Sequence, residues 1–177
     1  SSIVSGNVTA TAVWTQNSYS GKTYSDVKAT DWFYDYVMEL SADGIVNGND
    51  DGTFAPNRAT STGETLKLVL LATGHKAQQP SGRHWASGYG AYALSMGYLA
   101  RDKAEALDSP ISRLDVARLA ARALGYGASS AATPFADVDD GYVTALCEAG
   151  IFIGSQVNGQ TVFAPDSSIT RAEAATI

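Results

Sequence analysis

The residues that decide the fold are SITRAEAAT, Ser168–Thr176, because they contain the start of a helix. Thr170 and Glu173 have the S/T-x-x-E spacing of a capping box, in which each side chain accepts a hydrogen bond from a free backbone N–H at the helix N-terminus. Arg171 stands between them, where a cation faces the positive end of the helix dipole at a cost of roughly 0.3–1 kcal/mol if exposed. We therefore expect a further interaction to explain this arginine.

The same helix start occurs twice more along the chain. Ser61 and Glu64 reproduce the box with Thr62 at the arginine position, and Ser112–Asp115 keep the arginine but end on aspartate. Apolar residues at helical spacing follow both starts and predict a buried face: Leu66, Val69, Leu70 and Thr73 in one helix, and Val116, Leu119, Ala120 and Ala123 in the other. Helices this short are not stable alone, so we expect them to pack together.

A second element recurs with a period of 53 residues: GIVNG, GYLAR and GIFIG begin at Gly44, Gly97 and Gly150. A helical pattern precedes each glycine, which is the residue favoured just after a helix C-terminus. The loop sequences DGTFAP and TVFAP follow in the first and third copies. The sequence therefore predicts a mostly α domain of three helix-loop-helix repeats, arranged as a pseudo-threefold prism around a central helix bundle with grooves between neighbours.

The predicted domain covers residues 23–177, with repeat 1 at about 23–79, repeat 2 at about 80–127 and repeat 3 at about 128–177. The last helix has little sequence left, so we expect it to be truncated or frayed. Residues 1–22 include NVTATAVWT, whose alternating pattern predicts a short β-like segment, the tail or linker of a preceding β-rich domain.

Composition and motifs exclude several function classes. A formal charge of −6, without a basic stripe, argues against nucleic-acid binding, and no apolar run approaches the length of a membrane span. His75 and His84 have no nearby nucleophile and no metal-ligand spacing, so we expect no enzyme activity and no cofactor. The NGNDDG stretch resembles the start of a calcium loop, but Arg58 occupies its twelfth position, so we expect no metal.

ITRAE at Ile169–Glu173, YSDV at Tyr24–Val27 and FADV at Phe135–Val138, together with GIVNG and DGTFAP, resemble the S-layer homology domain in three tandem repeats. The resemblance implies a noncovalent anchor for extracellular proteins, bound to the secondary polysaccharide of a Gram-positive-type cell wall, often one carrying a pyruvate ketal. It also implies a location in the cell wall or S-layer, a neighbouring surface-layer protein as a further partner, and no enzyme activity.

The same resemblance implies a sugar site in each groove, formed by the arginine of the TRAE motif, a tryptophan of the first helix and residues near its start. By position, these are Arg171 and Arg113, Trp32 and Trp85, Asp26 and Asp137, and the loop glycines Gly48 and Gly154. An arginine would bind a carboxylate through two parallel hydrogen bonds, helix N-terminal N–H groups would add to the attraction, and the glycines would let sugar approach the backbone.

Alternative structural roles remain for these residues. The arginines suit a solvated surface, the tryptophans a core, and the aspartates a turn or a cap of the first helix. No repeat has the full set of arginine, tryptophan and aspartate, so we expect one or two working grooves. Residues 80–127 contain six Lys and Arg against four Asp and Glu, which favours an acidic polymer there and predicts salt-sensitive binding.

An alternative function is a module for protein–protein interaction or self-assembly, built on degenerate repeats that no longer bind sugar. Exposed Tyr89, Tyr92 and Tyr98 would serve such an interface. Under the anchor hypothesis, Arg171→Ala and Arg113→Ala weaken polymer binding with little effect on melting temperature, because the helix caps remain.

Overall fold

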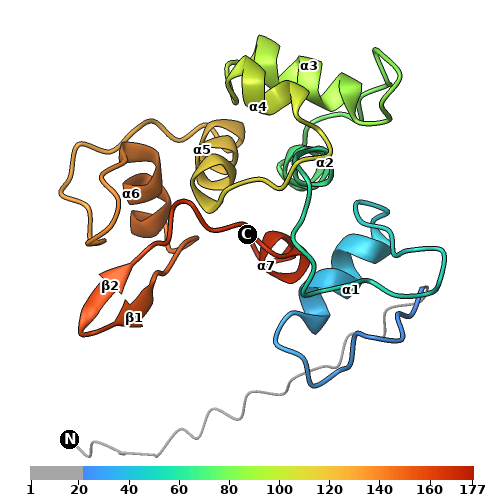
Figure 1. Cartoon of the computed structure of the whole chain (residues 1–177), viewed down its shortest axis with the longest axis horizontal. Helices are drawn as coiled ribbons and strands as arrows, with labels where there is room; N and C mark the ends of the chain where they lie inside the picture. Colours follow the sequence, from blue (N-terminus) through green and yellow to red (C-terminus); the bar gives the residue numbers. More distant parts are fainter. Residues whose placement is uncertain (1–21) are drawn as a thin grey trace, which may run out of the picture.

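The structure is a computed structural model that describes residues 22–177, so the predicted β-like segment, and all of the predicted tail or linker except Lys22, falls outside the described residues. The described part is mostly helical, as predicted, with one small hairpin (Figure 1). The helices are α1 (Tyr34–Ala42), α2 (Thr62–Ala72), α3 (Ser87–Ser95), α4 (Arg101–Glu105), α5 (Arg113–Ala123), α6 (Gly141–Glu148) and α7 (Arg171–Ala175), and the antiparallel strands are β1 (Ser155–Val157) and β2 (Gln160–Val162).

Helices α2, α5 and α7 begin at the three predicted caps. Ser61 and Glu64 form a complete capping box at α2, and Thr170 and Glu173 form one at α7. At α5, the Ser112 hydroxyl accepts from the Asp115 N–H at 3.1 Å. The shorter Asp115 carboxylate accepts from that hydroxyl, not from the Ser112 N–H, so this box is incomplete.

The three helix starts are joined by backbone hydrogen bonds in a closed cycle. The first N–H of each helix donates to a carbonyl just before another of them: Thr62 N–H to Ser109 O at 2.9 Å, Arg113 N–H to Ser167 O at 2.8 Å, and Arg171 N–H to Arg58 O at 2.9 Å. The second N–H of each helix is bonded in the same way, to Leu107, Pro165 and Pro56. Because the protein satisfies these donors, the expectation that helix N-termini add to ligand attraction is wrong.

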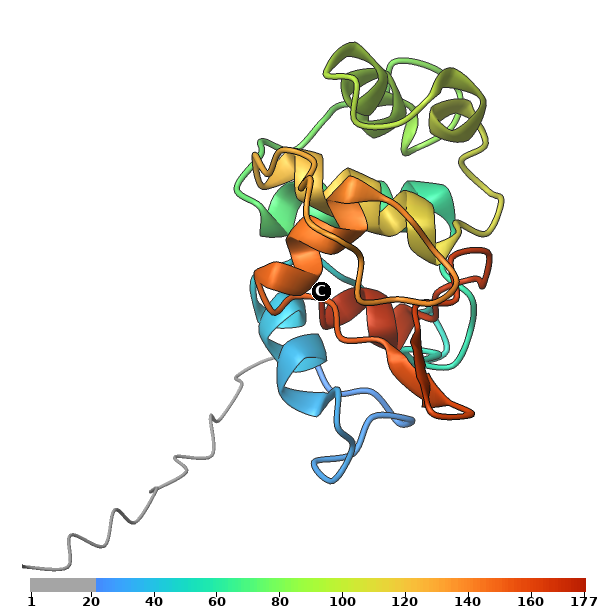
Figure 2. The ribbon, with the colours of Figure 1, turned by 90° about the vertical axis from the view of Figure 1, so that its left-hand side faces the viewer.

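The outer helices pack in the same cyclic order. Helix α3 packs on α2, α6 packs on α5, and α1 packs on α7. Figure 1 shows α2, α5 and α7 around the middle of the molecule, with α1, α3 and α6 outside them, and Figure 2 shows α3 and α4 together at one end. The mostly helical class is confirmed, while the division into three repeats and their prism arrangement stay predictions.

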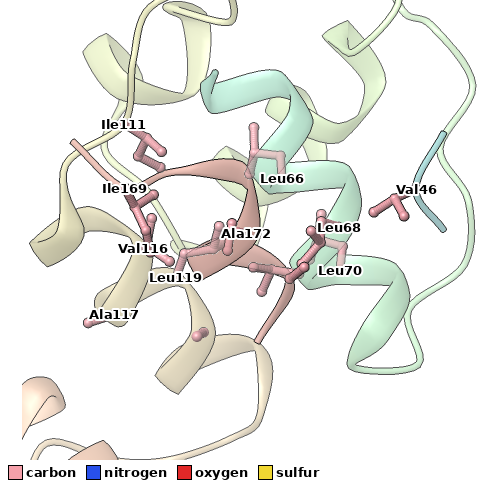
Figure 3. Close-up of a cluster of buried hydrophobic side chains, with 14 of the residues drawn as sticks. Val46, Leu66, Leu68, Leu70, Ile111, Val116, Ala117, Leu119, Ile169 and Ala172 are labelled. Carbon is pink, nitrogen blue, oxygen red and sulfur yellow. The ribbon is translucent and has the colours of Figure 1, made fainter. Parts of the chain in front are cut away.

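The predicted apolar faces form the core. Figure 3 shows Leu66 of α2, Val116 and Leu119 of α5, and Ile111 and Ile169 from the segments before α5 and α7, pointing toward a common centre. All five side chains are buried. The core therefore lies where the three helices meet, and it fixes the positions of the side chains at their N-termini.

Each of the three repeated glycines ends an outer helix, as predicted. Gly44, Gly97 and Gly150 have φ values of 71°, 70° and 73°, in the left-handed region that glycine adopts without a steric penalty. The chain thus turns at the same point after α1, α3 and α6, and the loops that follow α1 and α6 line the candidate site.

Candidate ligand-binding site

Two cavities contain the arginines that the sequence singled out. The Arg171 pocket, of about 260 Å³, is lined by residues that include Asn47, Phe54, Glu64, Lys67, Trp85 and Arg171. The Arg113 pocket, of about 420 Å³, is lined by residues that include Trp32, Arg113, Phe152, Gly154, Glu173 and Thr176. The two pockets are built from residues at corresponding positions of different predicted repeats.

In each pocket, three distant parts of the chain meet. The arginine comes from one inner helix, the capping glutamate comes from another, and the tryptophan precedes an outer helix of the third predicted repeat. The structure thus brings Arg171 together with Trp85, and Arg113 together with Trp32 and Gly154. Complementary residues meet across the predicted repeat boundaries, although no single repeat contains them all.

Arg171 is engaged by the protein itself. Its side chain is buried, its Nη1 forms an ion pair with Glu64, its Nη2 donates to Asn47 O at 2.9 Å, and its guanidinium lies 4.6 Å from the centre of the Phe54 ring. Burial lowers the pKa of Arg171, and the Glu64 carboxylate opposes this shift. The partner that explains the cation at this helix start is therefore Glu64, and the solvated-surface alternative is wrong for Arg171.

Glu64 is shared between two arginines. Its Oε1 also accepts from Arg58 Nη2 at 2.6 Å, and its Oε2 accepts from the Ser61 N–H at 3.0 Å. Burial alone would raise the pKa of Glu64, but the hydrogen bonds from Arg58 and Ser61 and the charge of Arg171 lower it. This carboxylate joins the α2 cap to the start of α7.

Arg113 has the corresponding position but no such partner. Its guanidinium packs between the rings of Phe152 and Phe163, 5.1 Å from each ring centre. Within residues 22–177 its side chain forms no ion pair, and its buried Nε has no hydrogen-bond partner. Burial lowers the pKa of Arg113, an effect that the nearby Glu173 opposes. Arg113 is a partly desolvated cation that lines a cavity.

Both tryptophans are exposed at the pocket margins. Trp32 is 64% exposed and Trp85 is 48% exposed, so the core alternative is wrong for both. Each lies one residue before the N-cap of an outer helix, not within the helix. The buried aromatic residue of the first of these segments is the neighbouring Phe33.

The two aspartates bind backbone. The Asp26 carboxylate accepts from Phe54 N–H at 2.7 Å and from Ala55 N–H at 2.8 Å. Asp137 makes the same pair of bonds, at 2.7 and 2.8 Å, with the loop before α7. These bonds lower the pKa of Asp137 although burial acts to raise it. Each aspartate holds a loop whose alanine has a positive φ, 57° at Ala55 and 59° at Ala164, and neither caps an outer helix.

The loop glycines make room for protein, not only for a ligand. A Cβ on Gly48 would lie 2.7 Å from Thr53 O and closer still to the Tyr24 ring. A Cβ on Gly154 would lie 2.6 Å from Phe135 Cε1 and closer still to Val162 O. Both glycines therefore allow a ring and a loop carbonyl to approach the backbone, and Gly154 also lines the Arg113 pocket.

Lys67 belongs to the Arg171 pocket and was not predicted from the sequence. It follows Glu64 by three residues on α2, is half-buried, and forms no ion pair or hydrogen bond within the described part of the chain. Burial lowers its pKa, and the charge of Lys22 adds to this. The available signal was its position: Lys67 is the lone cation of α2, one turn after the capping glutamate.

The third helix start, which lacks an arginine, is closed by protein. The Thr62 hydroxyl donates to Ser109 O at 3.2 Å, and a Cβ on Gly63 would lie 2.9 Å from the Ala86 Cβ. Cavities that hold the motif arginine therefore occur at two of the three helix starts.

Other features bear on the remaining function classes. Tyr89 and Tyr98 are buried and Tyr92 is half-buried, so the expectation that these tyrosines are exposed for an interface is wrong. Across residues 22–177, no cluster of three His, Cys, Asp or Glu side chains is arranged to hold a metal ion. None of the helices in this part is long and apolar enough to cross a membrane.

Comparisons with known proteins agree with this geometry. Residues 23–65 and 134–175 match the model of the S-layer homology domain, and these segments contain the loops and capping glutamates of both pockets. The chain is 37% identical over 54 residues to the "Middle cell wall protein" of Brevibacillus brevis, and 35% identical over 54 residues to the "Surface layer protein" of Brevibacillus choshinensis. Each match covers 30% of this chain and 5% of the relative. The chain thus matches the S-layer homology domain in two segments, one on either side of its middle.

Proposed function

We propose that the chain is a noncovalent cell-wall anchor that binds an acidic secondary cell-wall polysaccharide in the Arg113 and Arg171 pockets. Its location is the cell wall or S-layer of a Gram-positive-type bacterium, in keeping with the two family matches and the surface proteins that it resembles. In this proposal, repeat 2 (residues 80–127) is a divergent copy of the S-layer homology sequence, and the three repeats form a pseudo-threefold prism.

The observation that carries the proposal is the state of Arg113. A half-buried guanidinium without a carboxylate partner among the described residues loses hydration and gains no ion pair in return. Such a group binds a planar carboxylate through two charge-assisted hydrogen bonds, a geometry that lysine does not reproduce. The carboxylate of a pyruvate ketal would supply the negative charge that Arg113 does not receive from the protein.

The tryptophan supplies the second contact. Trp32 is at the margin of the Arg113 pocket with most of its surface exposed, so its indole offers a flat apolar face to the C–H face of a sugar ring. Arg113 and Trp32 would then recognise two different parts of one acidic sugar. An exposed apolar ring and a free cation in one pocket suit this ligand better than they suit a neutral sugar.

The alternative, a protein interaction module without sugar binding, is not supported by the residues on which it depended. Its interface was expected on Tyr89, Tyr92 and Tyr98, of which two are buried and the third is half-buried. A neighbouring surface-layer protein remains a proposed partner.

Sedimentation with isolated cell walls tests the proposal. Walls are prepared with and without chemical removal of pyruvate, and the chain is compared with Arg113→Ala. We expect the chain to sediment with native walls, to stay in solution after pyruvate removal, and to lose binding in the variant. Equal sedimentation with both wall preparations would contradict the acidic-polymer proposal and favour protein contact.

A further inference from the structure

We infer that the Arg171 pocket binds its anion through Lys67, and that it prefers a more highly charged group than the Arg113 pocket does. The inference rests on the proposed function, because it concerns the ligands of the same two pockets. It assigns the ligand cation of one pocket to a residue outside the TRAE motif.

The charge of the motif arginine in this pocket is already paired within the protein. Nη1 of Arg171 donates to Glu64 and Nη2 donates to the carbonyl of Asn47, so the guanidinium already has a carboxylate partner within the protein. Its Nε has no hydrogen-bond partner among the described residues, but this atom is buried and so is not accessible to a ligand. A ligand carboxylate would have to displace Glu64 to take the bidentate position. The arginine that the motif indicates is therefore a positioning residue, which fixes Glu64 and the Asn47 loop.

Lys67 has the opposite character. It lines the same cavity, half-buried, and no carboxylate of residues 22–177 pairs with it. Lys22 is at the edge of this site, where its Nζ donates to Asn47 Oδ1 at 2.9 Å, and its positive charge acts on Lys67. Two ammonium groups that repel one another, and that form no ion pair with a carboxylate of residues 22–177, are a place where an anion is stabilised.

The charge balance of the two pockets differs. Among the residues that line the Arg171 pocket, two cations, Lys67 and Arg171, accompany one carboxylate, Glu64. In the Arg113 pocket, Arg113 faces Glu173, and Thr176 occupies the position that corresponds to Lys67, three residues after the capping glutamate. A second negative charge on the ligand gains attraction in the Arg171 pocket, whereas Glu173 repels it in the Arg113 pocket.

Each pocket contains its own tryptophan, which allows the two to be observed separately. The chain is labelled with 5-fluorotryptophan, and the ¹⁹F signals are assigned with Trp32→Phe and Trp85→Phe. The probes are methyl glucuronide, which carries one carboxylate charge, and glucose 6-phosphate, which carries close to two charges at pH 7.5, with methyl glucoside as the neutral control. Each signal is titrated at fixed ionic strength.

We expect the Trp85 signal to respond to glucose 6-phosphate at about fivefold lower concentration than to methyl glucuronide, the size of one additional partly exposed ion pair. The Trp32 signal should show no preference for the phosphate. Lys67→Thr should remove the preference at Trp85, and the reciprocal Thr176→Lys should create one at Trp32. Lys67→Arg is the conservative variant and should retain it.

An unchanged Trp85 titration in Lys67→Thr would overturn the assignment of Lys67, as would equal responses of Trp85 to both charged probes. A Trp32 response to methyl glucuronide together with either of those results would leave the proposed function standing. If the Trp32 signal responded to neither charged probe while Trp85 showed a Lys67-dependent response, the ligand role of Arg113 would be contradicted instead.

Discussion

Replacing the two arginines by alanine should have different consequences, although both occupy the same position of the same motif. Arg171→Ala removes a charged donor from Asn47 O, a bond worth about 1.5–3 kcal/mol, and also removes an ion pair and a ring contact. Glu64 keeps Arg58 and the Ser61 N–H, so the cost stays below that of a fully orphaned buried charge. We expect the free energy of unfolding to fall by about 3 kcal/mol.

Arg113→Ala loses no ion pair and no side-chain hydrogen bond that the structure describes. The lost contacts are those with the rings of Phe152 and Phe163, which are worth about 1 kcal/mol and are offset by relief of a desolvated charge. For a domain of this size, 1 kcal/mol corresponds to roughly 2–4 °C. Melting temperature should therefore fall by roughly 6–12 °C in Arg171→Ala and by no more than about 4 °C in Arg113→Ala.

Calorimetry and urea unfolding, followed by circular dichroism, measure both variants. The sequence alone predicts little change in melting temperature for either variant, whereas the structure predicts a clear decrease for Arg171→Ala. The melting temperature of Arg171→Ala therefore distinguishes the two predictions. If the two variants melted together, or if Arg113→Ala were the less stable one, the ion pair between Arg171 and Glu64 would not be what stabilises the contact between α2 and the start of α7.

Three further predictions concern the supports of the pockets. Asp26→Ala and Asp137→Ala each remove two hydrogen bonds from backbone N–H groups to a carboxylate, and each should lower the free energy of unfolding by about 2 kcal/mol in urea titrations. A loss under about 0.5 kcal/mol would contradict the role of these aspartates in holding the loops. The folded pKa of Glu64 lies below its ordinary value of 4.5, so its stabilisation is complete above that pH and is lost as pH falls through the folded pKa. Glu64→Gln should therefore flatten the acid dependence of stability, whereas Glu105→Gln, at an exposed pair, should not. Gly154→Ala should lower melting temperature by several degrees, because its Cβ would overlap the Phe135 ring, whereas Gly127→Ala, which has open space around it, should not.

The local features of the fold were predictable because neighbouring residues determine them. The caps at Ser61 and Thr170 and the positive φ of Gly44 depend on residues within one turn, and the helical spacing of Leu66 and Val116 identifies the core faces. The hairpin, which was not predicted, also has a local signal: Asn158–Gly159, a favoured two-residue turn, has φ values of 49° and 78°.

The partners within each pocket could not be predicted, because they come from distant parts of the chain. Glu64 and Arg171 are 107 residues apart, and neither sequence neighbourhood identifies the other. The exposure of Trp32 depends on which of two adjacent aromatic residues turns inward, and the structure buries Phe33 instead. The roles of Asp26 and Asp137 likewise depend on loop backbone that lies more than 25 residues away.

The most direct test of the anchor is a calorimetric titration of the chain with purified cell-wall polysaccharide at low and high salt, repeated with Arg113→Ala and with polymer stripped of pyruvate. The account predicts binding that weakens with salt, and a large loss of affinity both in the variant, at an almost unchanged melting temperature, and on pyruvate removal. Affinity that is indifferent to salt, to pyruvate and to Arg113 would contradict it.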